Sequence, residues 1–268
     1  MHQEKIAEVI QEVKKVVVGQ DKMINRLLIG LFTNGHILLE GVPGLAKTLT
    51  VNTLAKVLHL DFNRIQFTPD LLPSDLIGTM IYNQQTSSFE VKKGPIFSNV
   101  ILADEVNRSP AKVQSALLEA MQEKQVTIGE TTYPLDRPFL VLATQNPVDQ
   151  EGTYPLPEAQ VDRFMMKVLV GYPQEDEEFV IVQRVIGQAI EVAAVTSTDQ
   201  IAQLQKTCRQ GYVDPSLIQF AVKLVSATRH PERFGLADWS RFITFGASPR
   251  ATIGLIEGAR ALAFLRGR

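Results

Sequence analysis

The chain has 268 residues, of which 45% are hydrophobic and 21% charged, and its formal net charge is −2. This composition is typical of a soluble protein with a large core and room for a smaller second domain, and it argues against a broad nucleic-acid or membrane surface. No apolar run reaches the roughly 18 residues that a membrane span needs. The single cysteine, Cys208, cannot form an internal disulfide, so we expect a cytoplasmic protein.

The first half of the chain predicts helices that alternate with short buried strands. Residues 1–15 carry apolar side chains at helical spacing, and a second helix follows a turn at Gly19 and Gln20. Apolar runs typical of buried strands cover residues 36–40, 63–67, 99–104, 139–144 and 165–170. This alternation predicts an α/β fold, with a parallel sheet covered by helices on both faces.

Two segments interrupt this alternation, and a third region departs from it. Residues 69–97 contain three prolines, and the segment is predicted to be an inserted loop region. It includes possible short strands near Met80 and Phe89. Residues 125–136 around Gly129 resemble a β-hairpin. Beyond Pro173 the pattern is helical only. We therefore expect an α/β domain over residues 1–172 and a small all-helical domain over residues 173–268.

A glycine-rich loop after the first strand gives the strongest functional signal. It lies between a strand and a helix, the arrangement that holds a nucleotide's phosphates, and its residues are Gly41, Val42, Pro43, Gly44, Leu45, Ala46, Lys47 and Thr48. Lys47 would reach the β- and γ-phosphates, and the Thr48 hydroxyl would bind Mg²⁺. Ala46 departs from the G-x-x-x-x-G-K-[ST] template, and we expect an ordinary helix-start conformation there. The alternative is a turn that binds nothing.

Two carboxylates follow the strand that ends at residue 104. Asp104 would hold Mg²⁺, and Glu105 would polarise the attacking water, because the end of a buried parallel strand lies at the ligand-binding edge of the sheet. Alone, the pair could equally be a solvated strand end. Asn146 follows the next strand and can place an amide beside the γ-phosphate, although an Asn-Pro turn is the common interpretation.

Two arginines are candidates for contact with the γ-phosphate. Arg163 could be an arginine finger that reaches the nucleotide of a neighbouring subunit, although spacing alone favours an intrachain salt bridge with Asp162 or Glu158. Arg250 lies in the first turn of an expected helix, where a cation opposes the helix dipole. It is therefore either a functional residue placed against its local preference or a solvent-facing arginine.

These sites, in this order, resemble an AAA+ ATPase and, more narrowly, the MoxR family. The similarity covers nearly the whole chain and is strongest in "GVPGLAKT" (41–48), "LADEVNRSPAKVQSALLEAMQE" (102–123) and "PLPEAQVDRF" (155–164). It implies a P-loop NTPase domain and a helical lid domain that is incomplete at its C-terminus. It also implies binding of ATP/ADP and Mg²⁺, with Walker A at Lys47 and Thr48 and Walker B at Asp104 and Glu105.

The resemblance implies further roles. Asn146 would be sensor 1, Arg163 the trans-acting finger and Arg250 sensor 2, while Gly19 and Gln20 match a turn beside the adenine. Arg108 matches a position that faces the neighbouring subunit. Residues 69–97 match the helix-2 insert, and residues 125–136 the hairpin before sensor 1.

The same resemblance implies a ring-forming ATPase, usually a hexamer, that remodels, assembles or activates a client protein beside a partner with a von Willebrand factor A domain. Two other functions stay open at this point. The first is a nucleotide-gated binding module with little turnover. The second is a DNA motor, since helicases share this fold.

Overall fold

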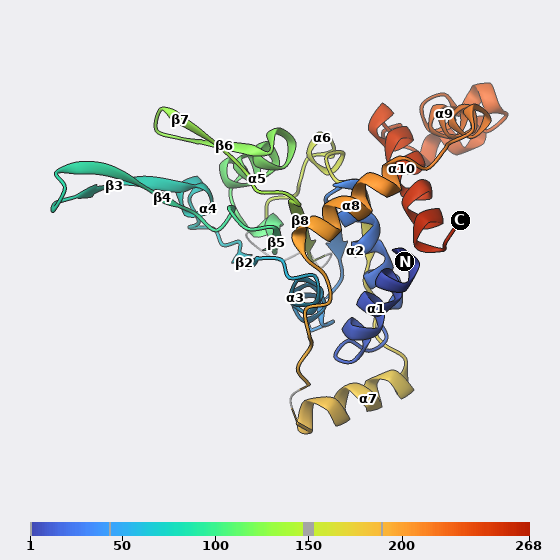
Figure 1. Cartoon of the computed structure of the whole chain (residues 1–268). Helices are drawn as coiled ribbons and strands as arrows, with labels where there is room; N and C mark the ends of the chain where they lie inside the picture. The colour runs from blue at the N-terminus through green and yellow to red at the C-terminus, as the bar shows by residue number, and fades with distance from the viewer. Residues whose placement is uncertain (1, 43, 147–152, 189) are drawn as a thin grey trace.

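A computed structural model of the chain describes residues 2–42, 44–146, 153–188 and 190–268. Within them, five strands form one parallel sheet in the order β2-β5-β8-β1-β9 (Figure 1). The inner strands are buried along nearly their whole length, as expected for strands covered on both faces. The strands are β1 (Ile37–Glu40), β2 (Phe62–Gln66), β5 (Val100–Asp104), β8 (Leu140–Gln145) and β9 (Met166–Leu169).

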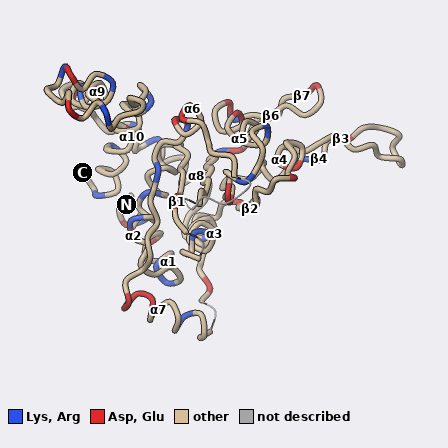
Figure 2. Tube along the Cα trace, turned by 180° about the vertical axis from the view of Figure 1, so that it is seen from behind, with Lys and Arg blue, Asp and Glu red and all other residues tan. Residues whose placement is uncertain are grey.

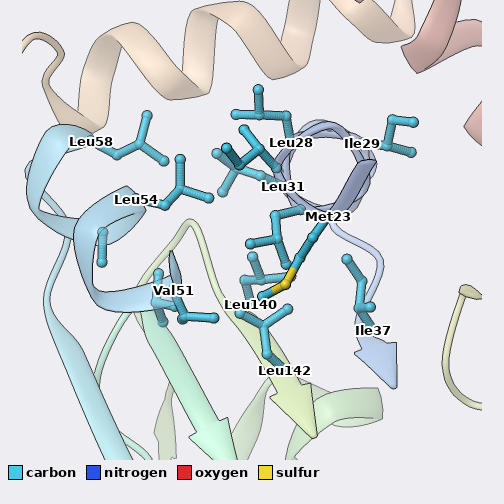
Figure 3. Close-up of a cluster of buried hydrophobic side chains, with 14 of the residues drawn as sticks. Met23, Leu28, Ile29, Leu31, Ile37, Val51, Leu54, Leu58, Leu140 and Leu142 are labelled. Carbon is cyan, nitrogen blue, oxygen red and sulfur yellow. The ribbon is translucent and has the colours of Figure 1, made fainter. Parts of the chain in front are cut away.

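Helices cover both faces of this sheet, as the alternating pattern predicted. Because side chains alternate along a strand, Ile37 and Leu39 of β1 enter the core under α2 and α3, whereas Leu38 enters the core under α4 and α5. Figure 3 shows side chains of α2 and α3 packed over Ile37, Leu140 and Leu142. The helices of this region are α1 (His2–Lys14), α2 (Asp21–Thr33), α3 (Lys47–Val57), α4 (Pro73–Ile77), α5 (Ala111–Glu123) and α6 (Glu158–Val161).

Two antiparallel hairpins project from one side of the body (Figure 1). The two strands expected near Met80 and Phe89 are confirmed, and they pair with each other as β3 (Gly78–Asn83) and β4 (Ser88–Lys93). The expected hairpin at residues 125–136 is formed by β6 (Gln125–Ile128) and β7 (Thr131–Pro134). Large apolar side chains are exposed on the β3–β4 hairpin: Met80, Ile81, Tyr82 and Phe89.

The C-terminal region is helical, as expected. At three helix starts a side chain accepts a hydrogen bond from a backbone N–H of the first turn; the accepting residues are Ser197, Asp214 and Ser248. The α8 and α10 helices pack against α2, while α7 lies below α1 and α3 (Figure 1). The region comprises α7 (Glu175–Ile186), α8 (Thr198–Arg209), α9 (Pro215–Arg229) and α10 (Pro249–Leu265), with 3₁₀ turns η2 (Pro231–Phe234) and η3 (Ala237–Phe242).

Charged residues of both signs are distributed along the chain. Basic and acidic residues are interspersed along the tube of Figure 2 and do not gather on one element, apart from the acidic first turn of α7. None of the helices in the described ranges combines the length and the apolar character that crossing a membrane requires.

A buried histidine anchors the beginning of β1. His36 is 6% exposed, its Nε2 lies 3.1 Å from the Met121 carbonyl oxygen, and its Nδ1 accepts the Val141 backbone N–H at 3.0 Å. The neutral ring therefore donates through Nε2 and accepts through Nδ1. Burial is the main reason why the pKa of His36 falls to about 4.

We expect this histidine to make the fold sensitive to acid. Its folded-state pKa lies below the unfolded value, so the unfolded chain binds the proton first and stability falls as pH drops from about 6.5 towards 4. Between pH 7 and pH 5 the free energy of unfolding should fall by about 2 kcal/mol through this group. Urea unfolding of wild type, His36→Gln and the exposed-site control His59→Gln measures this loss. An equal loss in His36→Gln would contradict the assignment, and NMR titration of His36 gives the same answer without a variant.

Candidate functional site

A polar hollow of about 370 Å³ lies at the carboxyl edge of the sheet. Strands β1, β2, β5 and β8 all end there, because parallel strands bring their carboxyl ends to one edge. Most of the residues predicted from the sequence to bind nucleotide meet in this hollow. Its lining consists of Gly41, Gly44, Leu45, Ala46, Lys47, Thr48, Leu49, Arg64, Gln66, Asp104, Glu105, Thr144 and Asn146.

The glycine-rich loop joins β1 to α3, as predicted. Gly44 adopts φ +87°, and among the described residues no atom lies within 4 Å of the place a Cβ would take, so the loop is open to a ligand here. A Cβ on Gly41 would lie 2.6 Å from the Val170 carbonyl oxygen, which requires glycine. Val42 is described but is not among the lining residues, and Pro43 lies outside the described residues.

The expectation for Ala46 is wrong. Its backbone is left-handed, with φ 53° and ψ 20°, and is not in an ordinary helix-start conformation. A Cβ in this region costs roughly 1–2 kcal/mol, which explains why the common template has glycine there. The strained residue immediately precedes α3, whose first two residues, Lys47 and Thr48, line the hollow.

Lys47 is the first residue of α3 and lies inside the hollow. Its Nζ donates to the Gly41 carbonyl oxygen at 2.7 Å. Partial burial lowers the pKa of Lys47, while the charges of Asp104 and Glu105 act to raise it. The ammonium group therefore faces both carboxylates across the space where phosphates would lie.

The Asp104 carboxylate is held from two neighbouring strands. Its Oδ1 accepts a 2.6 Å hydrogen bond from the Thr144 hydroxyl of β8. Its Oδ2 accepts from Arg64 of β2, through Nε at 3.0 Å and Nη2 at 2.6 Å. The sequence did not suggest a role for Arg64 or Thr144.

Glu105 follows in a strained conformation. Its φ is 56°, and its backbone N–H donates to the Thr144 hydroxyl at 2.8 Å. Its Oε2 accepts from Gln66 Nε2 at 3.1 Å and from Arg108 Nη1 at 3.0 Å. Strain of this kind costs about 1–3 kcal/mol and is typical of active sites, where it directs a side chain. Arg108, expected near a neighbouring subunit, is thus an ion-pair partner of Glu105 in this chain.

The donor set fits a hard divalent cation. Thr48 offers a hydroxyl oxygen and Asp104 a carboxylate, and both line the same hollow as Lys47. Mg²⁺ prefers oxygen ligands of this type and retains several waters. Asn146 lines the same hollow, as expected for an amide beside the γ-phosphate.

A smaller hollow of about 140 Å³ adjoins the first and shares Ala46 and Leu49 with it. Val16, Val17 and Val18 line it in place of the predicted Gly19 and Gln20, which immediately follow them. A Cβ on Gly19 would lie 2.5 Å from the Glu177 carboxylate of α7, so this turn lies directly against that helix. The α7 and α7–α8 residues of the lining are Ile181, Arg184, Val185 and Ile190.

The two candidate arginines lie elsewhere. Neither is among the described residues that line the phosphate-loop hollow; both line a third hollow of about 300 Å³ that also includes Gly35 and His36, at the amino end of β1. Arg163 Nη1 donates to the Leu118 carbonyl oxygen at 3.1 Å. Arg250, at the start of α10, pairs with Asp162 at 3.4 Å. The Asp162 pairing considered for Arg163 is thus made by Arg250.

A signal for two of the missed residues was present in the sequence. Arg64 and Gln66 are two apart, so they share one face of β2, and the register places Gln66 beside Asp104. Parallel strands end at one edge of a sheet, and this rule was applied to β5 but not to β2. Applied to β2, it would have identified Arg64 and Gln66.

Comparison with known proteins agrees with this site. Residues 36–166 match the family described as "ATPase family associated with various cellular activities (AAA)", and residues 239–268 match the AAA lid domain. The chain is 52% identical to Chaperone MoxR1 of Mycobacterium tuberculosis, over 97% of this chain and 69% of that protein. It is 30% identical to Protein MoxR of Methylorubrum extorquens, over 96% and 80%.

A solved structure is also similar. The crystal structure of a presumed ATPase from Cytophaga hutchinsonii is 63% identical and superposes with a TM-score of 0.94, over all of this chain and 82% of that one. Fold, phosphate loop, paired carboxylates and relatives all agree, and the chain therefore belongs to the MoxR family of AAA+ ATPases.

Proposed function

We propose that this ATPase is a Mg²⁺-dependent, ring-forming machine that remodels or assembles a partner protein. The observation that carries the proposal is the division of its functional groups between two ends of the sheet. Lys47 and Glu105 line the hollow at the carboxyl edge, whereas Arg163 and Arg250 lie beside a different hollow at the amino ends. One protomer thus places its phosphate site and the Arg163–Arg250 pair in separate hollows, so that neither arginine can serve the phosphates of its own chain in this arrangement.

The phosphates and the nucleobase of the bound nucleotide would occupy adjoining hollows. The phosphates would lie between Lys47 and the start of α3, and the base in the apolar hollow beside Val17 and Val185. Thr48 and Asp104 would hold Mg²⁺, which when bound neutralises phosphate charge. ADP would fill the same two hollows.

Glu105 would take a proton from the attacking water. Its carboxylate is fixed by Gln66 and Arg108, and its backbone by Thr144, so its direction does not depend on the nucleotide alone. Asn146 would orient the same water or the γ-phosphate. Glu105 and Asn146 lie in one hollow with Lys47, which is the arrangement this role requires.

Arg163 and Arg250 would act on the nucleotide of the neighbouring protomer. In a closed ring the amino-end surface of one protomer meets the phosphate hollow of the next, in a heterologous interface of the kind that forms rings. The proposal for Arg250 differs from the sequence-based one only in direction: the arginine would serve the next subunit, because it pairs with Asp162 next to Arg163. A hexamer is the expected ring.

The remodelling role rests on the projecting hairpin and the relatives. The projecting β3–β4 hairpin (Figure 1) exposes Tyr82 and Phe89, neither of which lines the phosphate-loop hollow, and a relative is named a chaperone. A partner with a von Willebrand factor A domain belongs to the same proposal. Nucleotide turnover would move the α7–α10 region, since α7 contributes to the base hollow.

The test is the ATPase rate per protomer as a function of protein concentration. A rate that rises with concentration would support a reaction centre shared between protomers. A flat, low rate over the whole range would contradict the ring and favour a nucleotide-gated binding module.

Lys47→Ala should weaken nucleotide binding. The variant removes the Lys47 ammonium group and leaves the Asp104 and Glu105 carboxylates facing the phosphates. A hydrogen bond from a charged group such as this ammonium to a phosphate is worth about 1.5–3 kcal/mol, or roughly 10- to 100-fold in Kd. Calorimetric titration with ADP measures the change. Lys56→Ala on the last turn of α3 is the control, and an unchanged Kd in Lys47→Ala would contradict the site.

Tyr82→Ser combined with Phe89→Ser should remove stimulation by a client and leave basal turnover unchanged. The two rings contact each other, with centroids 5.3 Å apart, and lie outside all three hollows. The probe is casein, an unfolded protein, added to the ATPase assay. Tyr172→Ser, at another exposed tyrosine, is the control. Equal stimulation of wild type and the double variant would exclude the hairpin as the contact.

A further inference from the structure

Among the described residues that line the phosphate-loop hollow, Arg64 is the one whose charge no part of the proposed reaction uses. It lies on β2, an edge strand of the sheet, and it lines the hollow together with Lys47. Its guanidinium gives two N–H donors to a single oxygen of Asp104, at 3.0 and 2.6 Å, and a third bond to Gln66 Oε1 at 2.8 Å.

Arg64 and Thr144 together engage both oxygens of Asp104. The two Arg64 donors are neighbouring nitrogens of one guanidinium, and they converge on Oδ2 from one side. Oδ1 accepts the Thr144 hydroxyl. Asp104 is also the carboxylate of the proposed Mg²⁺ site. The Arg64 guanidinium and Mg²⁺ would therefore compete for the oxygens of one carboxylate.

Burial makes this competition uneven. The Asp104 side chain is 15% exposed and is fixed by the strand and by Thr144, whereas the Arg64 side chain is 47% exposed. The arginine can therefore turn towards solvent or towards phosphate oxygens without any change in the sheet. The Asp104 carboxylate would stay in place while Mg²⁺ replaces Arg64 as its cationic partner.

We propose that Arg64 competes with Mg²⁺ for Asp104 and so sets the Mg²⁺ concentration at which nucleotide binds tightly. The inference rests on the proposed Mg²⁺·ATP site. Arg64 acts through Asp104 and is a positioning residue. Because Arg64 also holds Gln66, and Gln66 holds Glu105, release of Arg64 alters the contacts of the second carboxylate at the same time.

The experiment measures binding and does not depend on turnover. AMP-PNP is titrated into the full chain by calorimetry at a series of free Mg²⁺ concentrations, and the Mg²⁺ concentration that gives half of the full gain in affinity is recorded. In Arg64→Ala and Arg64→Gln this midpoint should fall by about three- to tenfold, the range expected for loss of a partly exposed charged contact. Arg64→Lys, which keeps the charge, should lie between these variants and wild type.

A closely matched ion pair provides the control. Lys167 of β9, the other edge strand, pairs with Glu40 at 2.6 Å, with side chains 48% and 19% exposed. Lys167→Ala removes a surface cation from an equivalent pair, and its Mg²⁺ midpoint should equal that of wild type. A midpoint in Arg64→Ala that is unchanged, or higher, would overturn the inference.

The two failures can be told apart. If wild type binds AMP-PNP equally with and without Mg²⁺, the proposed metal site itself is wrong. If wild type shows the gain and Arg64→Ala shows the same midpoint, the metal site stands and only the competition is rejected. Thermal unfolding of each variant verifies that it is folded.

Discussion

Glu105→Gln should bind ATP with nearly unchanged affinity and hydrolyse it about 10²- to 10⁴-fold more slowly, the usual contribution of a general base. The amide keeps the shape of the carboxylate and can still contact Gln66 and Arg108, but it cannot accept a proton from water. The left-handed backbone at this position is bonded to Thr144 through its N–H and is not altered by the substitution.

Steady-state phosphate release and calorimetric Kd, measured on the same preparation, separate these effects. The control is Glu119→Gln on the exposed face of α5, which should leave both quantities unchanged. Equal turnover of Glu105→Gln and wild type would show that another group activates the water.

Arg163→Ala should reduce turnover about 10³-fold or more, as loss of an arginine finger does. In the single chain this arginine donates to the Leu118 carbonyl oxygen and lies away from the phosphate-loop hollow, so the effect requires a neighbouring protomer. Nucleotide affinity of the unassembled protomer should not change.

Mixing two inactive variants gives a direct test of this arrangement. In an equal mixture of Arg163→Ala and Glu105→Gln, a junction with an intact Glu105 and an intact neighbouring Arg163 arises by chance in about a quarter of the interfaces of a ring. Turnover should therefore return to about that fraction of the wild-type rate. A mixture as inactive as its components would place the action of Arg163 within its own chain.

The sheet could be predicted from the sequence because its inner strands are covered on both faces. Such strands are continuous apolar runs that end in polar residues, so the runs before Gly41, Glu105 and Asn146 located both the strands and the functional edge. Asp104, at the end of the inner strand β5, was found for the same reason, whereas Thr144 of the inner strand β8 was not.

Arg64 and Gln66 were not found because β2 is an edge strand. Its side chains are largely exposed, so Arg64 looks like an ordinary solvent-facing residue in the sequence. Ala46 was misjudged for a different reason, since its left-handed backbone depends on how the loop closes onto α3 and not on its own preference. The placement of Arg163 and Arg250 depends on how α10 packs against the body, which no local pattern reports.

The opposite placement of Glu105 and Arg163 has a consequence for how the protein uses ATP in the cell. If hydrolysis needs both groups, a protomer alone retains its nucleotide and releases no phosphate, however much ATP surrounds it. The total rate then rises more steeply than the amount of protein, as expected for a reaction that follows association. Below the protein concentration at which protomers associate, the chain would hold ATP without hydrolysing it. Above that concentration it would turn ATP over.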